Sequence, residues 1–385
     1  MYQKYQQKTT QMKPVMGHGG DQEMNEEILQ IEMDLLQIQF DSLATDSKAL
    51  LDKLKNSFEL ADKLTLKVLN GYLKAWKWNR KFHGFNNVAY GATIDTIQSW
   101  CGKLFHCLWN TLQLVQMMRQ FKLDCSDPFD ELQTALTATL YKLVNGSFVV
   151  DQPPPQVKRM SGKFYASVRL LVGSALRTFN IEPIVKVSLI DENDAQLVVT
   201  RKFFVGGSTF CNISNDCSKI QYNEVTHRMI GMFCDMTLDG FKREKRGGEV
   251  VTDEKLALLF QSNFIIGDFQ FSLNELSHPL VVIVGGTQEP QAMATIFWDN
   301  VSEKIACLPF IVPEQVTWWQ LSEALNQIAF SYGERKLTVE NLHFSSEKIF
   351  RNHLPSLSPD ELVSRSLFYK DQVVTFHIGN GFMLH

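Results

Sequence analysis

Three consecutive prolines, Pro153 to Pro155, divide this 385-residue sequence into two parts with different hydrophobic periods. Proline fixes its own φ and lacks a backbone donor, so neither a helix nor a central strand continues through such a run. Apolar residues recur at spacings of three and four before the prolines and at alternate positions after them. The sequence therefore predicts a helical domain and a β-domain joined by a stiff proline-rich segment.

The part before the prolines is predicted to be helical from about residue 23 to residue 144. One apolar stripe marks the first helix and another marks the second: Ile28, Ile31, Leu35, Ile38 and Leu43, then Leu50, Leu54, Phe58, Ala61 and Leu64. A third helix is expected over residues 93–121, and a fourth from Phe129 to Val144, capped by Ser126 or Asp127 and closed by Gly146. Four long helices with short links are typical of an antiparallel coiled-coil bundle.

The part after the prolines contains strand-length runs rich in Val, Ile and Phe, separated by Gly, Asn, Asp and Pro. These runs span residues 163–173, 183–191, 196–206, 228–238, 256–266, 279–286 and 293–300. At least seven strands with no helix between them favour an antiparallel sandwich or barrel. From about residue 306 the pattern becomes helical again. We expect a flexible tail at 1–20, the bundle at 21–150, the β-domain at 151–305 and a small helical domain at 306–385.

Composition and motifs argue against several classes of protein. No phosphate-binding loop, nucleophile elbow or H-E-x-x-H motif is present, so we expect neither an enzyme nor a cofactor. The seven cysteines form no C-x-x-C pair, which favours a reduced cytosolic or nuclear setting. The stretch that holds Cys211, Cys217, His227 and Cys234 fits no standard zinc spacing, so no metal is expected. The N-terminus lacks the apolar core of a signal peptide, and no run is long and apolar enough to span a membrane.

Basic residues cluster in the loops of the predicted β-domain. They form three groups: Lys158 and Arg159; Arg201 and Lys202; and Lys242, Arg243, Lys245 and Arg246. Loops of a sandwich gather at its ends, so these groups can converge into a grip on a phosphate backbone. Residues 151–305 as a whole hold 16 Lys and Arg against 18 Asp and Glu, and the whole chain carries a net charge of −4. Charge alone therefore leaves a solvated loop surface open as the alternative.

Several segments resemble, in order, the signal transducer and activator of transcription (STAT) family. They are "QPPPQVKRMSGKFYASVRLLVG", "TRKFFVGG", "MTLDGFKREKRGGEVVTDEKLALLFQSNF", "PLVVIVGGTQEPQAMATIFWDN" and "PFIVPEQVTWWQLSEALN", with "AWKWNRKFHGF" and "IQSWCGKLFHCLWN" upstream. The resemblance covers residues 23 to about 354. It implies a four-helix coiled coil, an immunoglobulin-like DNA-binding β-domain and a helical linker domain that ends early, in "VVTFHIGNGFMLH".

The resemblance also implies roles for individual residues. Arg159 matches a family lysine near phosphate, and Lys158 lies beside it. Arg201 with Lys202 and the 242–246 cluster match further backbone contacts, while Glu254 takes the position of an acid near the base edges. Gly285 replaces the Asn or His with which family members read bases. Glycine has no side chain for this, so relaxed specificity is expected unless Thr287 or Gln288 compensates.

The function implied is that of a transcription factor of cytokine and JAK-type signalling, found in cytoplasm and nucleus. Its implied partners are palindromic TTC/GAA-type double-stranded DNA, other STAT chains and proteins that bind the coiled coil. No segment resembles the family's N-terminal domain or its phosphotyrosine-binding SH2 domain, so phosphotyrosine-dependent dimerisation is not expected. Two alternatives stay open: a DNA-binding factor given as a fragment, splice form or partial gene model, or a short interfering form that acts through the bundle without effective DNA binding.

Overall fold

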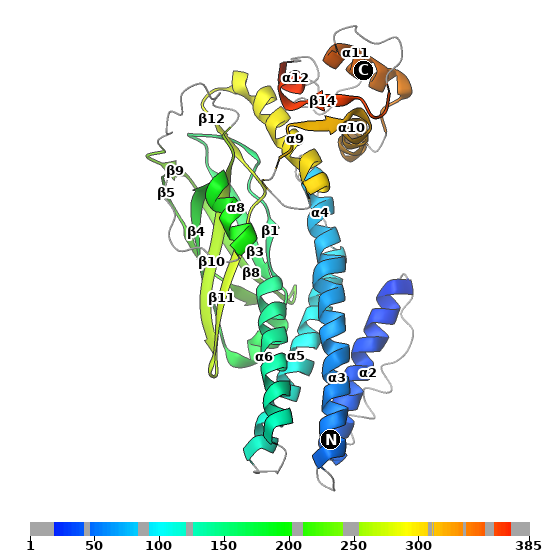
Figure 1. Ribbon diagram of the computed structural model, residues 1–385. Coiled ribbons are helices and arrows are strands. Elements are labelled where there is room, and N and C mark those ends of the chain that lie inside the picture. Colours follow the sequence, from blue (N-terminus) through cyan, green and yellow to red (C-terminus); the bar gives the residue numbers. More distant parts are fainter. Residues whose placement is uncertain are drawn as a thin grey trace.

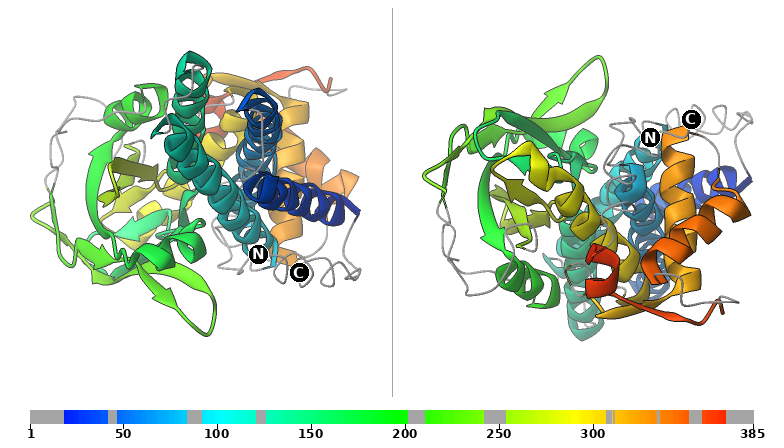
Figure 2. Two further views of the ribbon diagram at one scale, coloured as in Figure 1. Left: turned by 90° about the horizontal axis from the view of Figure 1, so that it is seen from below. Right: turned by 90° about the horizontal axis from the view of Figure 1, so that it is seen from above.

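The computed structural model describes residues 19–41, 47–83, 92–120, 126–201, 211–241, 254–306, 310, 312–333, 336–350 and 358–370. Figure 1 shows a helical bundle with a β-domain along one side and a group of smaller helices at one end. The two views in Figure 2, which look along the bundle, place the β-domain to one side of the long helices. Most of the expected N-terminal tail, Leu43 and residues after 370 lie outside the described residues. Within the described part, no helix is long and apolar enough to cross a membrane.

The bundle is formed by the four helical segments that the sequence predicts. They are α2 (Gly19–Asp41), α3 (Ser47–Leu66) continued by the π-helix η1 (Lys67–Leu73) and α4 (Lys74–His83), α5 (Ala92–Gln120), and α6 (Ser126–Gly146). The predicted stripes are buried at Ile28, Ile31, Leu35, Ile38, Leu50, Leu54, Ala61 and Leu64, whereas Phe58 is half-buried. Helix α6 begins ahead of Pro128, because proline is tolerated in the first turn of a helix.

The β-domain is an antiparallel sandwich of two four-stranded sheets. One sheet has the order β1 (Phe148–Gln152), β3 (Phe164–Leu170), β8 (Arg228–Met236), β7 (Gln221–Asn223). The other has the order β11 (Phe269–Leu276), β10 (Leu256–Ile266), β4 (Ile184–Asp191), β6 (Cys217–Lys219). The buried rings of Phe233 and Phe260 lie 5.4 Å apart between the two sheets. The sandwich expected from the alternating runs is confirmed.

The triple proline lies one strand later than the sequence suggested. Strand β1 follows α6 after the single residue Ser147, so the prolines separate β1 from β2 (Val157–Arg159) inside the β-domain. The buried residues Phe148, Val149 and Val150 form too short an apolar run to be distinguished from the end of the preceding helix. The bundle and the first sheet are therefore joined directly, without a spacer.

Two segments predicted as strands are helical, so the expectation of a β-domain without helices is wrong. Residues 196–201 belong to α8 (Glu192–Arg201), where Asp191 accepts a hydrogen bond from the Asp194 N–H at 2.7 Å and caps the first turn. Its buried residues Ala195 and Val198 have helical spacing. Residues 293–300 belong to α9 (Glu289–Ala306), in which the consecutive residues 294–301 are all buried, so this stretch shows no helical period. A short turn of helix, α7 (Gly173–Leu176) with η2 (Arg177–Phe179), also follows β3.

The C-terminal helices lie where the sequence predicts them. They are α10 (Trp318–Gly333) and α11 (Val339–Phe350), joined by α12 (Arg365–Lys370) and a small ribbon of β13 (Gln315–Thr317) and β14 (Leu362–Ser364). Helix α9 supplies Trp298 to their core, where its ring centroid lies 5.5 Å from that of Phe368. Figure 1 shows α9 running from the β-domain towards these helices. It is the element that connects the two.

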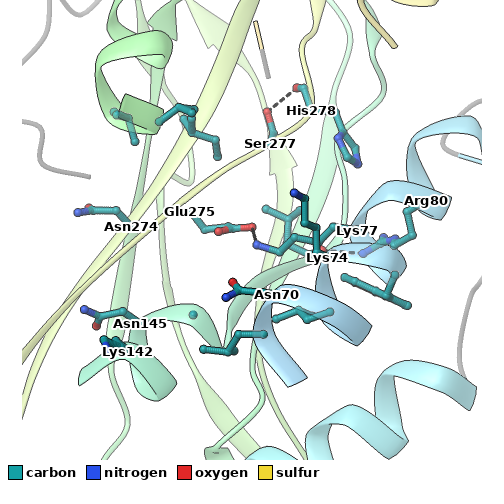
Figure 3. Close-up of a pocket in the computed structure, with 18 of the residues that line it drawn as sticks. Asn70, Lys74, Lys77, Arg80, Lys142, Asn145, Asn274, Glu275, Ser277 and His278 are labelled. Carbon is teal, nitrogen blue, oxygen red and sulfur yellow. Dashed lines mark hydrogen bonds and ion pairs between the residues drawn. The ribbon is translucent and has the colours of Figure 1, made fainter. Parts of the chain in front are cut away.

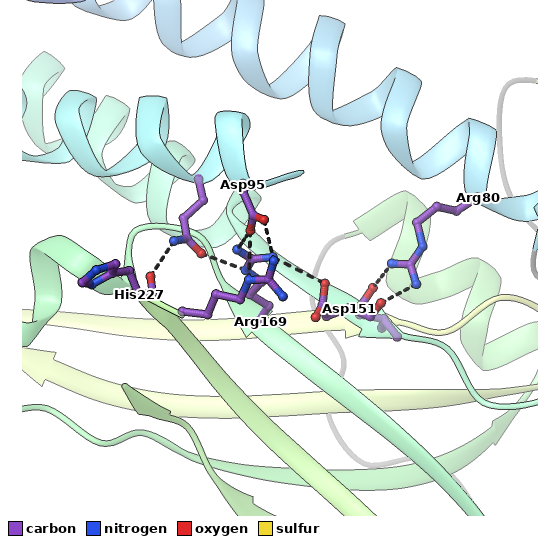
Figure 4. Close-up of polar contacts among 8 residues, drawn as sticks. Arg80, Asp95, Asp151, Arg169 and His227 are labelled. Carbon is purple, nitrogen blue, oxygen red and sulfur yellow. Dashed lines mark hydrogen bonds and ion pairs between the residues drawn. The ribbon is translucent and has the colours of Figure 1, made fainter. Parts of the chain in front are cut away.

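A polar network ties the bundle to the β-domain (Figure 4). Asp95 of α5 accepts hydrogen bonds from Arg169 of β3 and from Arg228 of β8, whose Nε lies 3.0 Å from Asp95 Oδ1. Gln98 accepts from Arg169 Nε at 2.8 Å and donates to the His227 carbonyl at 2.7 Å. Burial raises the pKa of Asp95, but the two arginines outweigh it and hold that pKa below its ordinary value. The fully buried Arg169 thereby gains a charged partner at the junction.

Candidate nucleic-acid interface

The candidate interface is built on a parallel strand pair. Strand β2 pairs with β12 (Val281–Ile283), so that Arg159 lies opposite Ile283 at the end of both strands. The Met160 N–H donates to the Ile283 carbonyl at 2.9 Å and extends the pairing by one bond. Residues 157–159 and 284–288 are far apart in the sequence, and this pair brings them to one edge of the β-domain.

Arg159 is the exposed basic residue at this edge. Its side chain is 65% exposed, and its Nη2 lies 3.5 Å from Glu289 Oε2 at the first turn of α9. A Cβ atom added to Gly286 would lie 3.4 Å from the same Nη2, so the guanidinium reaches across the turn after β12. A salt bridge between two exposed groups is weak and is readily exchanged for another anion. The Arg159 guanidinium is therefore accessible to an anion from outside the protein.

The turn after β12 is shaped by its own side chains. Gly285 is extended, with φ −129° and ψ 156°, and leads into the 3₁₀ turn η3 (Gly286–Gln288). Gln288 Oε1 accepts the backbone N–H groups of Val284 at 2.9 Å and Gly285 at 3.4 Å. Its carbonyl oxygen is thus occupied in holding the turn, whereas Thr287 is exposed. Thr287 is the better placed of the two for an outside partner.

Lys158 points away from the exposed surface. It is 5% exposed, and its ammonium donates to the carbonyls of Arg159 and Gly162 and lies 5.1 Å from the Phe164 ring centroid. Burial lowers the pKa of this lysine. The residue expected to touch the DNA backbone beside Arg159 instead closes the turn that carries Arg159.

The segment of Glu254 is fixed by the residue after it. Lys255 is buried and donates to Asp299 of α9 at 2.6 Å and Glu192 of α8 at 2.8 Å. Leu256 exchanges backbone hydrogen bonds with Leu280, which immediately precedes β12. The half-buried Glu254 is thereby held at the side of the β2–β12 pair. Sequence reasoning missed Lys255, although a single lysine before the apolar run 256–260 was a usable signal.

The other basic residues are only partly placed. Arg201 is the last residue of α8, which packs on β4 and β10. Lys202, Lys242, Arg243, Lys245 and Arg246 lie outside the described residues. The structure therefore brings Arg159 together with residues 285–288, and leaves the convergence of the three basic groups as an expectation. Among described residues, no three His, Cys, Asp or Glu side chains gather as a metal site.

A helical bundle packed on a β-sandwich, with further helices attached through α9, defines a multidomain protein with an exposed loop edge on its β-domain. Three family models match consecutive parts of the chain: the STAT transcription factor coiled-coil domain at residues 2–144, the STAT protein DNA-binding domain at 151–283, and the STAT linker domain at 306–378. The chain belongs to the signal transducer and activator of transcription family.

One curated relative, the "Signal transducer and transcription activator" of Drosophila melanogaster, is similar over most of the chain. It is 35% identical over 317 residues, which is 80% of this chain and 42% of the Drosophila protein. The chain thus spans less than half the length of that relative.

Proposed function

We propose that this chain is a STAT-type transcription factor that binds double-stranded DNA through the loops at the β2–β12 edge of its β-domain. The observation that supports this most is the parallel β2–β12 pair, which sets the exposed Arg159 beside residues 285–288 and the first turn of α9. An arginine and a helix N-terminus together favour a phosphate group. The family model for a DNA-binding domain covers residues 151–283, which include β2 and β12 and end just before the turn of residues 285–288.

Some residues of this edge contact the DNA, and others hold the turns that carry the contacting residues. Arg159, with Arg201, Lys202, Lys242, Arg243, Lys245 and Arg246, contacts phosphates, which gives affinity without sequence preference. Glu254 and Thr287 face the base edges, while Gly285 gives no direct readout, so specificity is relaxed. Lys158 and Gln288 hold the turns on which the contacting groups are mounted. The chemistry required is binding only, and no catalytic step or cofactor is involved.

The wider setting follows from the family. We infer that the chain acts in cytokine and JAK-type signalling, moves between cytoplasm and nucleus, and recognises palindromic TTC/GAA-type sites together with other STAT chains. The bundle presents long exposed helical faces for protein partners. The name of the Drosophila relative, a signal transducer and transcription activator, agrees with this role.

Arg159→Ala in the whole 385-residue chain tests the assignment of the edge. We expect weaker binding to cognate and scrambled duplexes alike. The slope of log K against the logarithm of salt concentration should become shallower by about one, as for a lost phosphate contact. Changing Lys242, Arg243, Lys245 and Arg246 together to Ala should give a larger loss of the same kind. Lys186→Ala is the control, because it also removes one positive charge. Lys186 is exposed on β4, where it lies opposite Gln261 and away from the end of β10 that adjoins β12. Unchanged affinity of the Arg159 variant at low salt would sink the assignment.

A further inference from the structure

A pocket of about 850 Å³ lies where the bundle meets the β-domain, and its lining includes Ser277 to Pro279 but none of the residues of the β2–β12 pair. Its walls come from η1 and α4, from α6, from β11 with the residues that follow it, and from α8. Figure 3 shows Asn70, Lys74 and Lys77 on the bundle helix, with Lys77 meeting Glu275 of β11 across the pocket. A volume of this size is within the range of about 300–1,000 Å³ that is typical of sites for small organic molecules.

The walls of this pocket are largely apolar. Aliphatic and aromatic side chains contribute from every wall: Leu69 and Leu73 of η1, Tyr141 of α6, Leu276 of β11 and Val198 of α8, together with Leu66, Val150 and Phe310. Leu69 and Asn70 lie on the π-helix η1, a distortion that is rare in proteins and often found at functional sites. The distortion therefore lies in the part of the bundle helix that lines the pocket.

The charges around the pocket are unbalanced. Four cationic side chains line it, Lys74, Lys77, Arg80 and Lys142, against the single carboxylate of Glu275. Lys77 pairs with Glu275, and Arg80 donates to the backbone carbonyls of Val150, at 2.7 Å, and Asp151. Lys74 and Lys142 are exposed, and among the described residues neither is paired with a carboxylate. The ammonium groups of Lys74 and Lys142 therefore give the pocket an excess of positive charge.

A buried donor in the wall is also unsatisfied. Trp76 is 4% exposed, lines the pocket, and its indole Nε1–H has no hydrogen-bond partner among the described residues. The Arg80 guanidinium lies 4.4 Å from the centroid of its ring. Buried polar groups in proteins are nearly always hydrogen-bonded, to protein, water or ligand. Because the N–H itself is buried, Trp76 contributes its ring, and not this donor, to the wall of the pocket.

We propose that the pocket binds a small organic anion with an apolar body, of which a medium-chain carboxylate is the simplest case. The apolar part lies against the leucines, the ring of Trp76 and Val198, and the acid group is attracted by the positive charges of Lys74 and Lys142. Because the ligand contacts both the bundle and the β-domain, it stabilises their joint. The proposal does not rest on DNA binding.

Titration calorimetry of the whole chain with decanoate, below its micelle concentration, tests the proposal. We expect one saturable site for decanoate, a melting temperature that rises with decanoate concentration, and no saturable binding of decyltrimethylammonium, which has the same tail and the opposite charge. Equal binding of both compounds, or none of decanoate, would overturn it. Binding of an acidic, apolar peptide without binding of decanoate would overturn it as well, because the site would then take a protein segment.

Variants locate the site. Lys74→Glu with Lys142→Glu should weaken decanoate binding about tenfold or more, since two favourable charge contacts become repulsive. Lys67→Glu, an exposed lysine on the same helical rod that does not line the pocket, should leave it unchanged. Val199→Trp, which fills the pocket from α8, should abolish binding without reversing any charge. Circular dichroism checks that each variant is folded, and undiminished affinity in a folded Val199→Trp chain would refute the location.

Discussion

At the scale of single residues, the junction between bundle and β-domain depends most on Asp95. Its carboxylate accepts hydrogen bonds from Arg169, which is fully buried, and from Arg228, whose Nη2 lies 2.5 Å from Asp95 Oδ2. A guanidinium removed from water is costly unless it is paired and hydrogen-bonded. Asp151 lies 3.8 Å from Arg169 and offers a weaker second partner. Asp95 is therefore the main partner that offsets the cost of burying the Arg169 guanidinium.

Asp95→Asn should lower the free energy of unfolding by about 1–3 kcal/mol, the loss expected for hydrogen bonds to a charged group. Urea unfolding at pH 7 measures it, with the exposed Asp52→Asn on α3 as the control that should change little. Because the folded pKa of Asp95 is below its ordinary value of 3.8, its contribution is present above that value and is lost as pH falls through the lowered pKa. The difference between wild type and variant should thus narrow below about pH 4. A difference that does not depend on pH would contradict the ion pairing.

At the scale of elements, the sequence was sufficient to predict helices and strands that have one buried face. The stripes of α2 and α3, and the alternating runs of β4 and β8, have the periods of half-buried helices and strands, and they fold accordingly. Helix α9 was missed because it is covered by the β-domain on one side and by the C-terminal helices on the other. A segment that is buried all round has no period, so its apolar run resembles a central strand.

The candidate site was only partly predictable for a related reason. Basic residues in loops can be read from the sequence, but whether a lysine faces water depends on neighbours that are distant in the chain. Lys158 turns inward because the carbonyls of the 159–162 turn and the ring of Phe164 surround it. The partnership of Lys255 with Glu192 and Asp299 joins three separate elements. Only the packed structure brings such groups together.

The short helix α7 packs tightly on β8, and Gly173 permits this close packing because it has no side chain. A Cβ atom added to Gly173 would lie 2.2 Å from the Cβ of Met229, closer than two carbon atoms can approach. Gly173→Ala should therefore lower the free energy of unfolding by about 1–3 kcal/mol, as overpacking does. Gly71→Ala in η1 is the matched change, because nothing lies within 4 Å of its added Cβ. It should be neutral or stabilise the chain by about 0.5–1 kcal/mol. Thermal or urea unfolding compares the two, and equal effects would argue against the tight contact.

At the scale of the whole molecule, helix α9 joins the β2–β12 edge of the β-domain to the core of the C-terminal helices. Helix α9 begins at the turn of residues 285–288 and ends in the core of the C-terminal helices, and Lys255 holds it to β10 and α8. The turn of residues 285–288 is thus attached to a helix that is itself fixed at both ends. Such rigid support allows a small change of side chain there to alter recognition without altering the fold.

Gly285→Asn tests whether this edge enters the major groove. We expect the variant to discriminate better between cognate and mutated sites, by about 1–3 kcal/mol if a good base contact forms. The extended backbone at Gly285, and the absence of close contacts around its added Cβ, leave room for the side chain. Competition binding with cognate and single-base-mutated duplexes measures the specificity ratio. An unchanged ratio would count against placing this turn in the groove.

The central claim is that the β-domain reads DNA sequence, and one measurement tests it most directly. Fluorescence anisotropy of the whole chain should be recorded with a palindromic TTC-spacer-GAA duplex and with a scrambled duplex across a series of salt concentrations. The account predicts tighter binding to the palindromic duplex, with affinity that falls steeply as salt rises. Equal weak binding to both duplexes, or no binding to either, would contradict it and direct attention to the protein partners of the bundle.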